Sequence, residues 1–158
     1  MSASPKKAQD SLILRDVYFS STVGKTINEF DPKYVANLHD LYVQSAEYID
    51  RFDMIFAEDD QKKIFRAFVN FGSRWLSDDA PRKKSQKTDD NRSIHALIEA
   101  RLIVEYFLSE EAEEEQLPTL ASKLAFSDAW PLWKEYLLSE LNRLKLSGVK
   151  IPNQKKKS

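Results

Sequence analysis

Apolar side chains recur at steps of three and four residues along much of this chain, which is the spacing of one face of an α-helix. The first such stretch runs from Asp31 to Phe56. Asp31 suits a helix N-cap, and Pro32 suits the first helical position, where its missing N–H is not needed. The last stretch begins at Ser127 and reaches Gly148, which suits a C-cap. These signals predict two long helices.

Two further stretches between them predict the centre of the molecule. Residues 60–76 hold several large aromatic side chains at helical spacing, and residues 94–108 are apolar around most of a helical circumference. A shorter helix is expected from Pro118 to Phe126. Residues 12–19 fit a short helix, although their β-branched residues also allow a strand.

The fold class predicted from these patterns is all-α, a single-domain bundle of five or six helices with flexible termini. Residues 1–10 are expected to form a disordered tail, residues 11–148 the helical domain, and residues 149–158 a flexible basic tail. The length of 158 residues suits one domain, and only 3 glycines disfavour a turn-rich all-β fold.

Composition narrows the classes of function. The net charge is −1 and there is no cysteine, so bulk attraction to nucleic acid, disulfides and thiol chemistry are disfavoured. No signal peptide and no apolar run long enough for a bilayer is present. We therefore expect a cytoplasmic or nuclear protein that does not bind membranes.

The most polar interior stretch, Asp78 to Arg92, contains a local group of bases: Arg82, Lys83, Lys84 and Lys87. Acidic pairs lie on both sides within a Debye length, and no aromatic residue is available to stack on a base. The stretch therefore reads as a solvated loop, and the alternative is a contact for nucleic acid or an acidic protein surface.

Two other groups are candidates for contact with a partner. Five glutamates lie between Glu110 and Glu115, and a basic partner is the functional alternative to a solvated loop. The helix after Ser127 carries aromatic side chains that line either the core or a groove for a partner helix. The candidate residues in these two groups are Glu110, Glu111, Glu113, Glu114, Trp130, Trp133 and Tyr136.

Catalytic motifs are weak. Gly24-Lys25-Thr26 matches only the end of a phosphate-binding loop, because Phe19 stands where the first glycine belongs. His95 and Glu99 are four residues apart and would share a helical face as an acid/base pair or two metal ligands. No cofactor and no complete metal site are expected.

The function predicted from sequence is a non-enzymatic protein-interaction module, such as an adaptor, a regulator or a subunit of a complex. It would contact another protein through its polarised charge and an exposed aromatic face. One alternative is association with nucleic acid through residues 82–87 and the Lys-rich C-terminal tail. A further alternative is an enzyme that uses His95 and Glu99.

Overall fold

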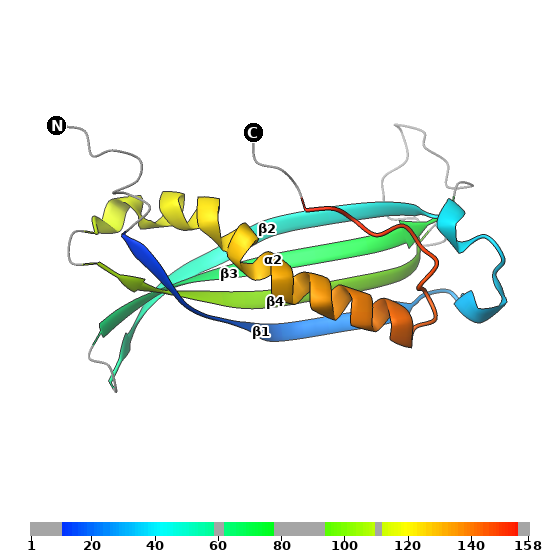
Figure 1. Ribbon diagram of the computed structural model, residues 1–158, viewed down its shortest axis with the longest axis horizontal. Helices are drawn as coiled ribbons and strands as arrows, with labels where there is room; N and C mark the ends of the chain where they lie inside the picture. Colours follow the sequence, from blue (N-terminus) through cyan, green and yellow to red (C-terminus); the bar gives the residue numbers. More distant parts are fainter. Residues whose placement is uncertain (1–10, 59–61, 78–93, 110–111, 155–158) are drawn as a thin grey trace. The chain divides into compact units, whose positions relative to one another are not determined.

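The computed structural model describes residues 11–58, 62–77, 94–109 and 112–154. Over these ranges the chain is built mainly from four long strands followed by one long helix (Figure 1). The strands are β1 (Leu12–Thr26), β2 (Tyr42–Ala57), β3 (Lys62–Leu76) and β4 (Ile94–Leu108), and the helix is α2 (Leu117–Arg143). Single 3-10 turns form η1 (Pro32–Tyr34), η2 (Leu38–Asp40) and η4 (Glu114–Gln116).

The four strands form one sheet in the order β1-β4-β3-β2, so β3 and β4 are central and β1 and β2 are the edges. Main-chain bonds continue the pairing of β1 with β4 past both strand ends, from Ser109 N–H to Ser11 O (3.0 Å) and from Ile27 N–H to His95 O (2.9 Å). As residue numbers rise along β1, the residue numbers of its partners on β4 fall, so the two strands are antiparallel.

The predicted all-α bundle of five or six helices is therefore wrong. Residues 60–76 and 94–108, expected to be the two central helices, are the central strands β3 and β4. In β4 every second residue from Ile94 to Tyr106 is buried, and in β3 the same holds from Ala67 to Trp75. That is the two-residue period of a strand. Each strand also carries apolar residues on its other face. Together the two sets recur at three- and four-residue steps, and this spacing led to the helical prediction.

The chain forms two compact units, and every strand and α2 contribute to both. Unit 1 comprises the residues up to Ser21, Glu47–Asn70 and Arg101–Leu132. Unit 2 comprises Thr22–Ala46, Phe71–Ala100 and the residues from Trp133 on.

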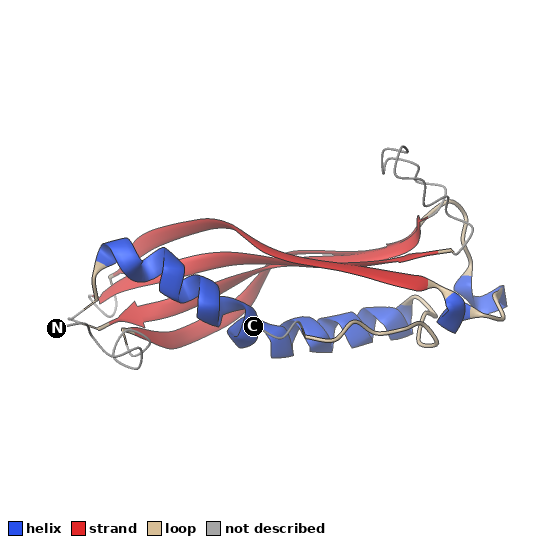
Figure 2. Ribbon diagram, turned by 90° about the horizontal axis from the view of Figure 1, so that it is seen from above, coloured by secondary structure: helices blue, strands red, loops and turns tan. Residues whose placement is uncertain are grey.

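In unit 1 the first part of α2 packs on one face of the strands, where the Tyr106 hydroxyl of β4 donates a hydrogen bond to Asp128 Oδ2 (2.7 Å). Tyr106 is 1% exposed. Its pKa is raised well above the ordinary value, mainly by burial and secondly by the hydrogen bond to the Asp128 carboxylate. In unit 2 the later part of α2 lies along one side of the strands (Figure 2), and Trp133 stacks on Phe71 of β3 with ring centroids 5.4 Å apart. Helix packing thus buries one sheet face in each unit.

The predicted helices at Pro118–Phe126 and from Ser127 on are one continuous helix, with Pro131 in its interior. Proline cannot donate to the carbonyl four residues earlier, so one helical hydrogen bond is lost at Ser127. The helix ends at Arg143, five residues before the expected cap at Gly148. Lys145 adopts a φ of 62°, and the Leu146 N–H bonds back to the Leu141 carbonyl at 2.7 Å. This is the left-handed turn that commonly ends helices, here without glycine.

The predicted helix from Asp31 to Phe56 is also wrong, although its start signal is real. The Asp31 side chain accepts from the Lys33 N–H (3.1 Å) and Pro32 follows, as predicted for a cap. The helical turn ends at Tyr34, however, and residues from Tyr42 on form the edge strand β2. The strand reading of residues 12–19 is the correct one of the two alternatives.

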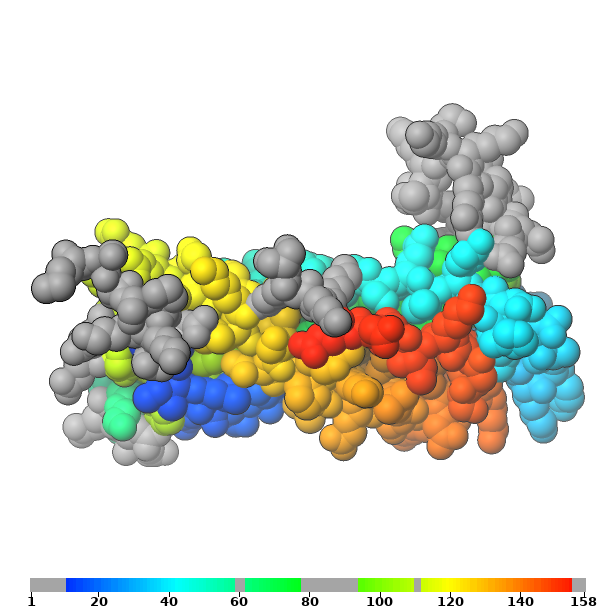
Figure 3. All heavy atoms as spheres, turned by 45° about the horizontal axis from the view of Figure 1, so that its top comes forward, coloured from blue at the N-terminus to red at the C-terminus, as the bar shows by residue number. Residues whose placement is uncertain are grey.

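The segment after α2 packs against unit 2. Val149 is buried, and the Lys150 carbonyl accepts a hydrogen bond from the Trp75 indole (2.9 Å). Gly148 lies against Leu38 of η2, close enough that an added Cβ would meet the Leu38 Cβ at 3.5 Å. Figure 3 shows this C-terminal segment in red at the surface of unit 2. Of the two tails predicted to be flexible, 1–10 and 149–158, only residues 149–154 lie within the described ranges.

Candidate functional site

The sheet face of unit 1 opposite α2 carries a cluster of charged residues around one phenylalanine. Three guanidinium groups lie over the Phe68 ring: Arg51 at 4.5 Å, Arg101 at 4.5 Å and Arg66 at 5.1 Å, each measured from Cζ to the ring centroid. Phe68 is only 4% exposed, although none of the helices in the described residues covers it on this side. The planar guanidinium groups therefore serve as its cover, with the cation–π attraction expected for that geometry. We call these four residues, with the carboxylates that hold them, the Phe68 cluster.

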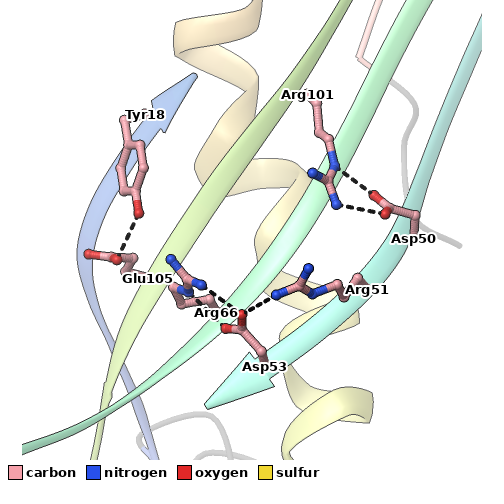
Figure 4. Close-up of polar contacts among 7 residues, drawn as sticks. All are labelled: Tyr18, Asp50, Arg51, Asp53, Arg66, Arg101 and Glu105. Carbon is pink, nitrogen blue, oxygen red and sulfur yellow. Dashed lines mark hydrogen bonds and ion pairs between the residues drawn. The ribbon is translucent and has the colours of Figure 1, made fainter. Parts of the chain in front are cut away.

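Two aspartates of β2 hold the guanidinium groups in place (Figure 4). Asp53 receives two hydrogen bonds from Arg66, at 2.7 and 2.6 Å, and a third from Arg51 at 2.7 Å. Asp50 receives two from Arg101, at 3.2 and 2.8 Å. Paired bonds of this kind fix the orientation of a guanidinium as well as its position.

The contacts also show how β2 presents these residues. Asp50 and Arg51 are consecutive, yet Asp50 pairs with Arg101 and Arg51 lies over Phe68, both on one sheet face. Side chains normally alternate between faces, so the alternation of β2 shifts by one residue here, as at a β-bulge.

Glu105 of β4 extends the cluster to the opposite edge strand. It is 4% exposed and accepts hydrogen bonds from Arg15 (2.6 Å) and from the Tyr18 hydroxyl (2.9 Å), both on β1. A buried carboxylate is stable only when it is paired and hydrogen-bonded, and these two partners meet that requirement.

The titration behaviour follows from this pairing. The hydrogen bonds from Arg66 lower the pKa of Asp53, and those from Arg101 lower the pKa of Asp50. Hydrogen bonding to Asp53 raises the pKa of Arg66. The pKa of Tyr18 is raised mainly by burial and secondly by its hydrogen bond to Glu105. Asp50 and Asp53 are thus each held in the charged form by a guanidinium. The arrangement suits a rigid recognition surface better than proton transfer, which needs a group whose pKa lies near the working pH.

Beside the cluster, unit 1 contains an open hollow of about 710 Å³. Its apolar lining includes Ile13 of β1 with Phe107 and Leu108 of β4, and Lys62 lies over the Phe107 ring at 5.3 Å. Glu114 lines the rim and pairs with Lys63 at 3.5 Å. The hollow can take an apolar side chain of another molecule.

Large apolar side chains are also exposed on the edge strands of unit 1. Tyr48 is 57% exposed, Met54 37% and Phe56 59% on β2, and Ile13 and Leu14 are 56% and 47% exposed on β1. Exposed apolar groups gathered on one surface commonly mark interaction sites. The edges of unit 1 are therefore its most apolar accessible regions.

None of the residues proposed from sequence as contact sites is a member of the Phe68 cluster. Arg82, Lys83, Lys84 and Lys87 fall outside the described ranges, as do Glu110 and Glu111, so their role stays a prediction. Glu113 and Glu114 are exposed in unit 1, before α2.

The aromatic candidates on α2 differ in exposure. Trp133 is 1% exposed in the core of unit 2, Tyr136 is half-buried beside it, and Trp130 is half-buried in unit 1. Trp133 therefore serves core packing in this structure. Partner contact by these three residues stays a prediction.

The proposed pair of His95 and Glu99 is separated by the strand. Both lie on one face of β4, but four residues of extended chain span about 13 Å, whereas four helical residues span about 6 Å. His95 instead stacks on Phe30, with ring centroids 4.7 Å apart. The helical geometry on which that acid/base pair depended is absent from β4.

Sequence reasoning missed every member of the Phe68 cluster. One signal was available: Arg66 and Asn70 interrupt one apolar stretch at a spacing of four, and Arg101 and Glu105 interrupt the next in the same way. In a strand this spacing places each pair on one face. Their partners on β2 and β1 come from distant parts of the chain.

No protein-family model matches this sequence, and no curated protein matches it. The fold is nevertheless similar to that of a SecB-like chaperone. The solved structure is that of Rv1957 from Mycobacterium tuberculosis in complex with a ChAD peptide from the Rv1956 HigA1 antitoxin. The TM-score is 0.64 with 14% sequence identity, and the match covers 94% of each chain. At this identity the likeness establishes the shared fold.

In the part of the chain that the structure describes, no helix has the length and apolar character needed to cross a membrane.

Proposed function

We propose that this chain binds extended or unfolded segments of other proteins and acts as a chaperone of the SecB-like kind. The observation that carries the proposal is the fold shared over 94% of both chains with a SecB-like chaperone that was solved with a peptide from another protein. The proposal keeps the protein-interaction role predicted from sequence and replaces the helical adaptor with a sheet-based binding protein in the cytoplasm.

The exposed side chains of unit 1 support this proposal. Unfolded proteins expose apolar side chains and unpaired backbone groups, and a protein that binds them needs accessible apolar surface of its own. Tyr48, Met54 and Phe56 supply such surface on β2, and the hollow beside Phe107 supplies another site on the same unit. The Phe68 cluster keeps the sheet face between them fixed by paired hydrogen bonds.

The exposed acids Glu113 and Glu114 fit a secondary role in this proposal. Glu114 lines the hollow together with Lys62 and Lys63, so the rim offers charges of both signs to the polar residues of a client segment. Contact of Glu113 and Glu114 with a basic partner stays a prediction from the sequence.

A test is suppression of aggregation. A thermally unstable enzyme such as citrate synthase is heated with an equimolar amount of this chain, without ATP, and light scattering is followed. We expect scattering to be strongly reduced, whereas an equal amount of lysozyme should leave it unchanged. Scattering that stays at the control level with the chain in several-fold excess would contradict the proposed function.

A further inference from the structure

The end of strand β2 in unit 1 has the properties of a strand-pairing site. In the described part of the sheet its only neighbour is β3, so the outer backbone groups of β2 face away from the sheet. We call residues Phe52–Ala57, which follow the bulge at Asp50 and Arg51, the β2 edge segment. It reads FDMIFA, with no proline, glycine or lysine. Natural edge strands usually contain such residues, because they prevent pairing with other chains.

The one charge in this segment does not protect the edge. Asp53 accepts three hydrogen bonds, two from Arg66 and one from Arg51, and so is already neutralised on the sheet face. The side chains left exposed along the segment are Met54 and Phe56. The segment therefore offers an uncharged, apolar edge.

The opposite edge in unit 1 differs. There Asp16 is exposed on β1, where its side chain accepts a hydrogen bond from the backbone N–H of Val17 at 2.8 Å, so an exposed carboxylate stands on this edge strand. A charged side chain at this position disfavours an incoming strand. Of the two edges, β2 is the one suited to pairing.

We propose that the β2 edge segment binds a client as an added strand, taking an uncharged extended stretch of about six residues with apolar side chains at alternate positions. The inference rests on the proposed chaperone function and names how one part of the client is held. The occupant follows from the edge itself: free N–H and C=O groups in strand register pair with extended backbone, and an uncharged apolar rim selects against charged segments.

The test uses two labelled peptides of alternating valine and threonine with Gly-Ser flanks. One has ordinary backbone, and the other is N-methylated at every second residue, so it keeps its side chains and loses the N–H groups of one edge. Binding is followed by fluorescence anisotropy, and backbone hydrogen exchange locates the bound peptide. We expect the methylated peptide to bind at least about tenfold more weakly and β2 amides to gain protection.

Matched variants locate the site on one edge. Phe56→Lys places a charge on the β2 edge segment and should lower the affinity for the unmethylated peptide about tenfold. Val23→Lys makes the same kind of change at an exposed aliphatic residue on β1, in unit 2, and should alter binding less than about twofold. Circular dichroism of both variants confirms that each is folded.

The outcomes separate the two proposals. Equal binding of both peptides, or protection confined to β1, overturns strand addition at β2 and leaves the chaperone function standing. Strand addition is also overturned if sedimentation shows that Phe56→Lys dissociates a dimer while peptide binding is unchanged. The segment would then join two copies of the chain. Failure of both peptides together with unsuppressed aggregation overturns the chaperone function itself.

Discussion

Arg66 and Asp53 face each other across β3 and β2 through two parallel hydrogen bonds, Nε to Oδ1 at 2.7 Å and Nη2 to Oδ2 at 2.6 Å. Both side chains are 19% exposed, and Arg66 also lies over Phe68. One residue pair thus joins an edge strand to a central strand and helps to cover Phe68 on the sheet face of unit 1 opposite α2.

Breaking this pair should destabilise the fold. We expect Asp53→Asn to lower the free energy of unfolding by about 1–3 kcal/mol, because Arg66 and Arg51 lose their charged acceptor in a partly buried site. Arg143→Ala is the control: its pair with Glu140 is 74% exposed on the arginine side, and its loss should cost less than about 1 kcal/mol. Urea denaturation measures both, and equal losses would contradict a special role for the cluster.

The same aspartates should make stability depend on pH. Their pKa values are lowered in the folded chain, so they stabilise it above the unfolded aspartate pKa of about 3.9. This contribution is lost as the pH falls through the folded-state pKa values. We expect the urea concentration at half-unfolding to decrease as the pH is lowered below about 4. The decrease should be less steep in the Asp50→Asn, Asp53→Asn double variant. Parallel profiles for the two proteins would show that other groups cause the loss.

Phe68 should be essential to the cluster. Phe68→Ala removes a buried ring and is expected to cost about 3–5 kcal/mol. Phe68→Leu keeps apolar volume but removes the π face beneath three guanidinium groups, and should still cost about 1–2 kcal/mol. Thermal unfolding of the two variants distinguishes the effects. A leucine variant as stable as the parent would mean that the guanidinium groups need only apolar contact.

Tyr106 and Asp128 provide a test of how α2 meets the sheet in unit 1. Tyr106→Phe should lower stability by about 1–2 kcal/mol, because the Asp128 carboxylate loses a hydrogen-bond donor beside the core. The pairing is confirmed if the loss is much smaller in an Asp128→Ala background, where no carboxylate remains to be satisfied. Additive losses in that double-mutant cycle would show that the two residues do not interact.

Lys145 offers a stabilising change. Its φ of 62° strains any residue with a Cβ, and its side chain is exposed. Lys145→Gly should therefore raise stability by up to about 1 kcal/mol, while Lys145→Ala, which keeps the Cβ, should give no gain. Chemical denaturation of the two variants decides between relief of strain and loss of a charge.

Local chemistry was correctly predicted where it depends on neighbouring residues. Asp31 and Pro32 do begin a helical turn, the region after Pro118 is helical, and the buried aromatic residues of 60–76 do form core. The error lay in how far each pattern extends. Alanines at 67, 96 and 100 favour helix intrinsically, yet each is buried in a strand, because tertiary burial outweighs a propensity of a few tenths of a kcal/mol per residue.

By itself, the sequence determined which residues are apolar enough to be buried, where single caps and turns form, and that its charges nearly cancel. Only the tertiary structure decided that residues 62–76 and 94–108 are strands, since apolar residues such as Phe68 and Ile103 on the less buried face mask the alternation that would reveal them. The tertiary structure also determines which residues come together in the Phe68 cluster. Arg66, Asp53 and Glu105 come from three different strands, and a pairing across strands depends on register, which no local pattern encodes.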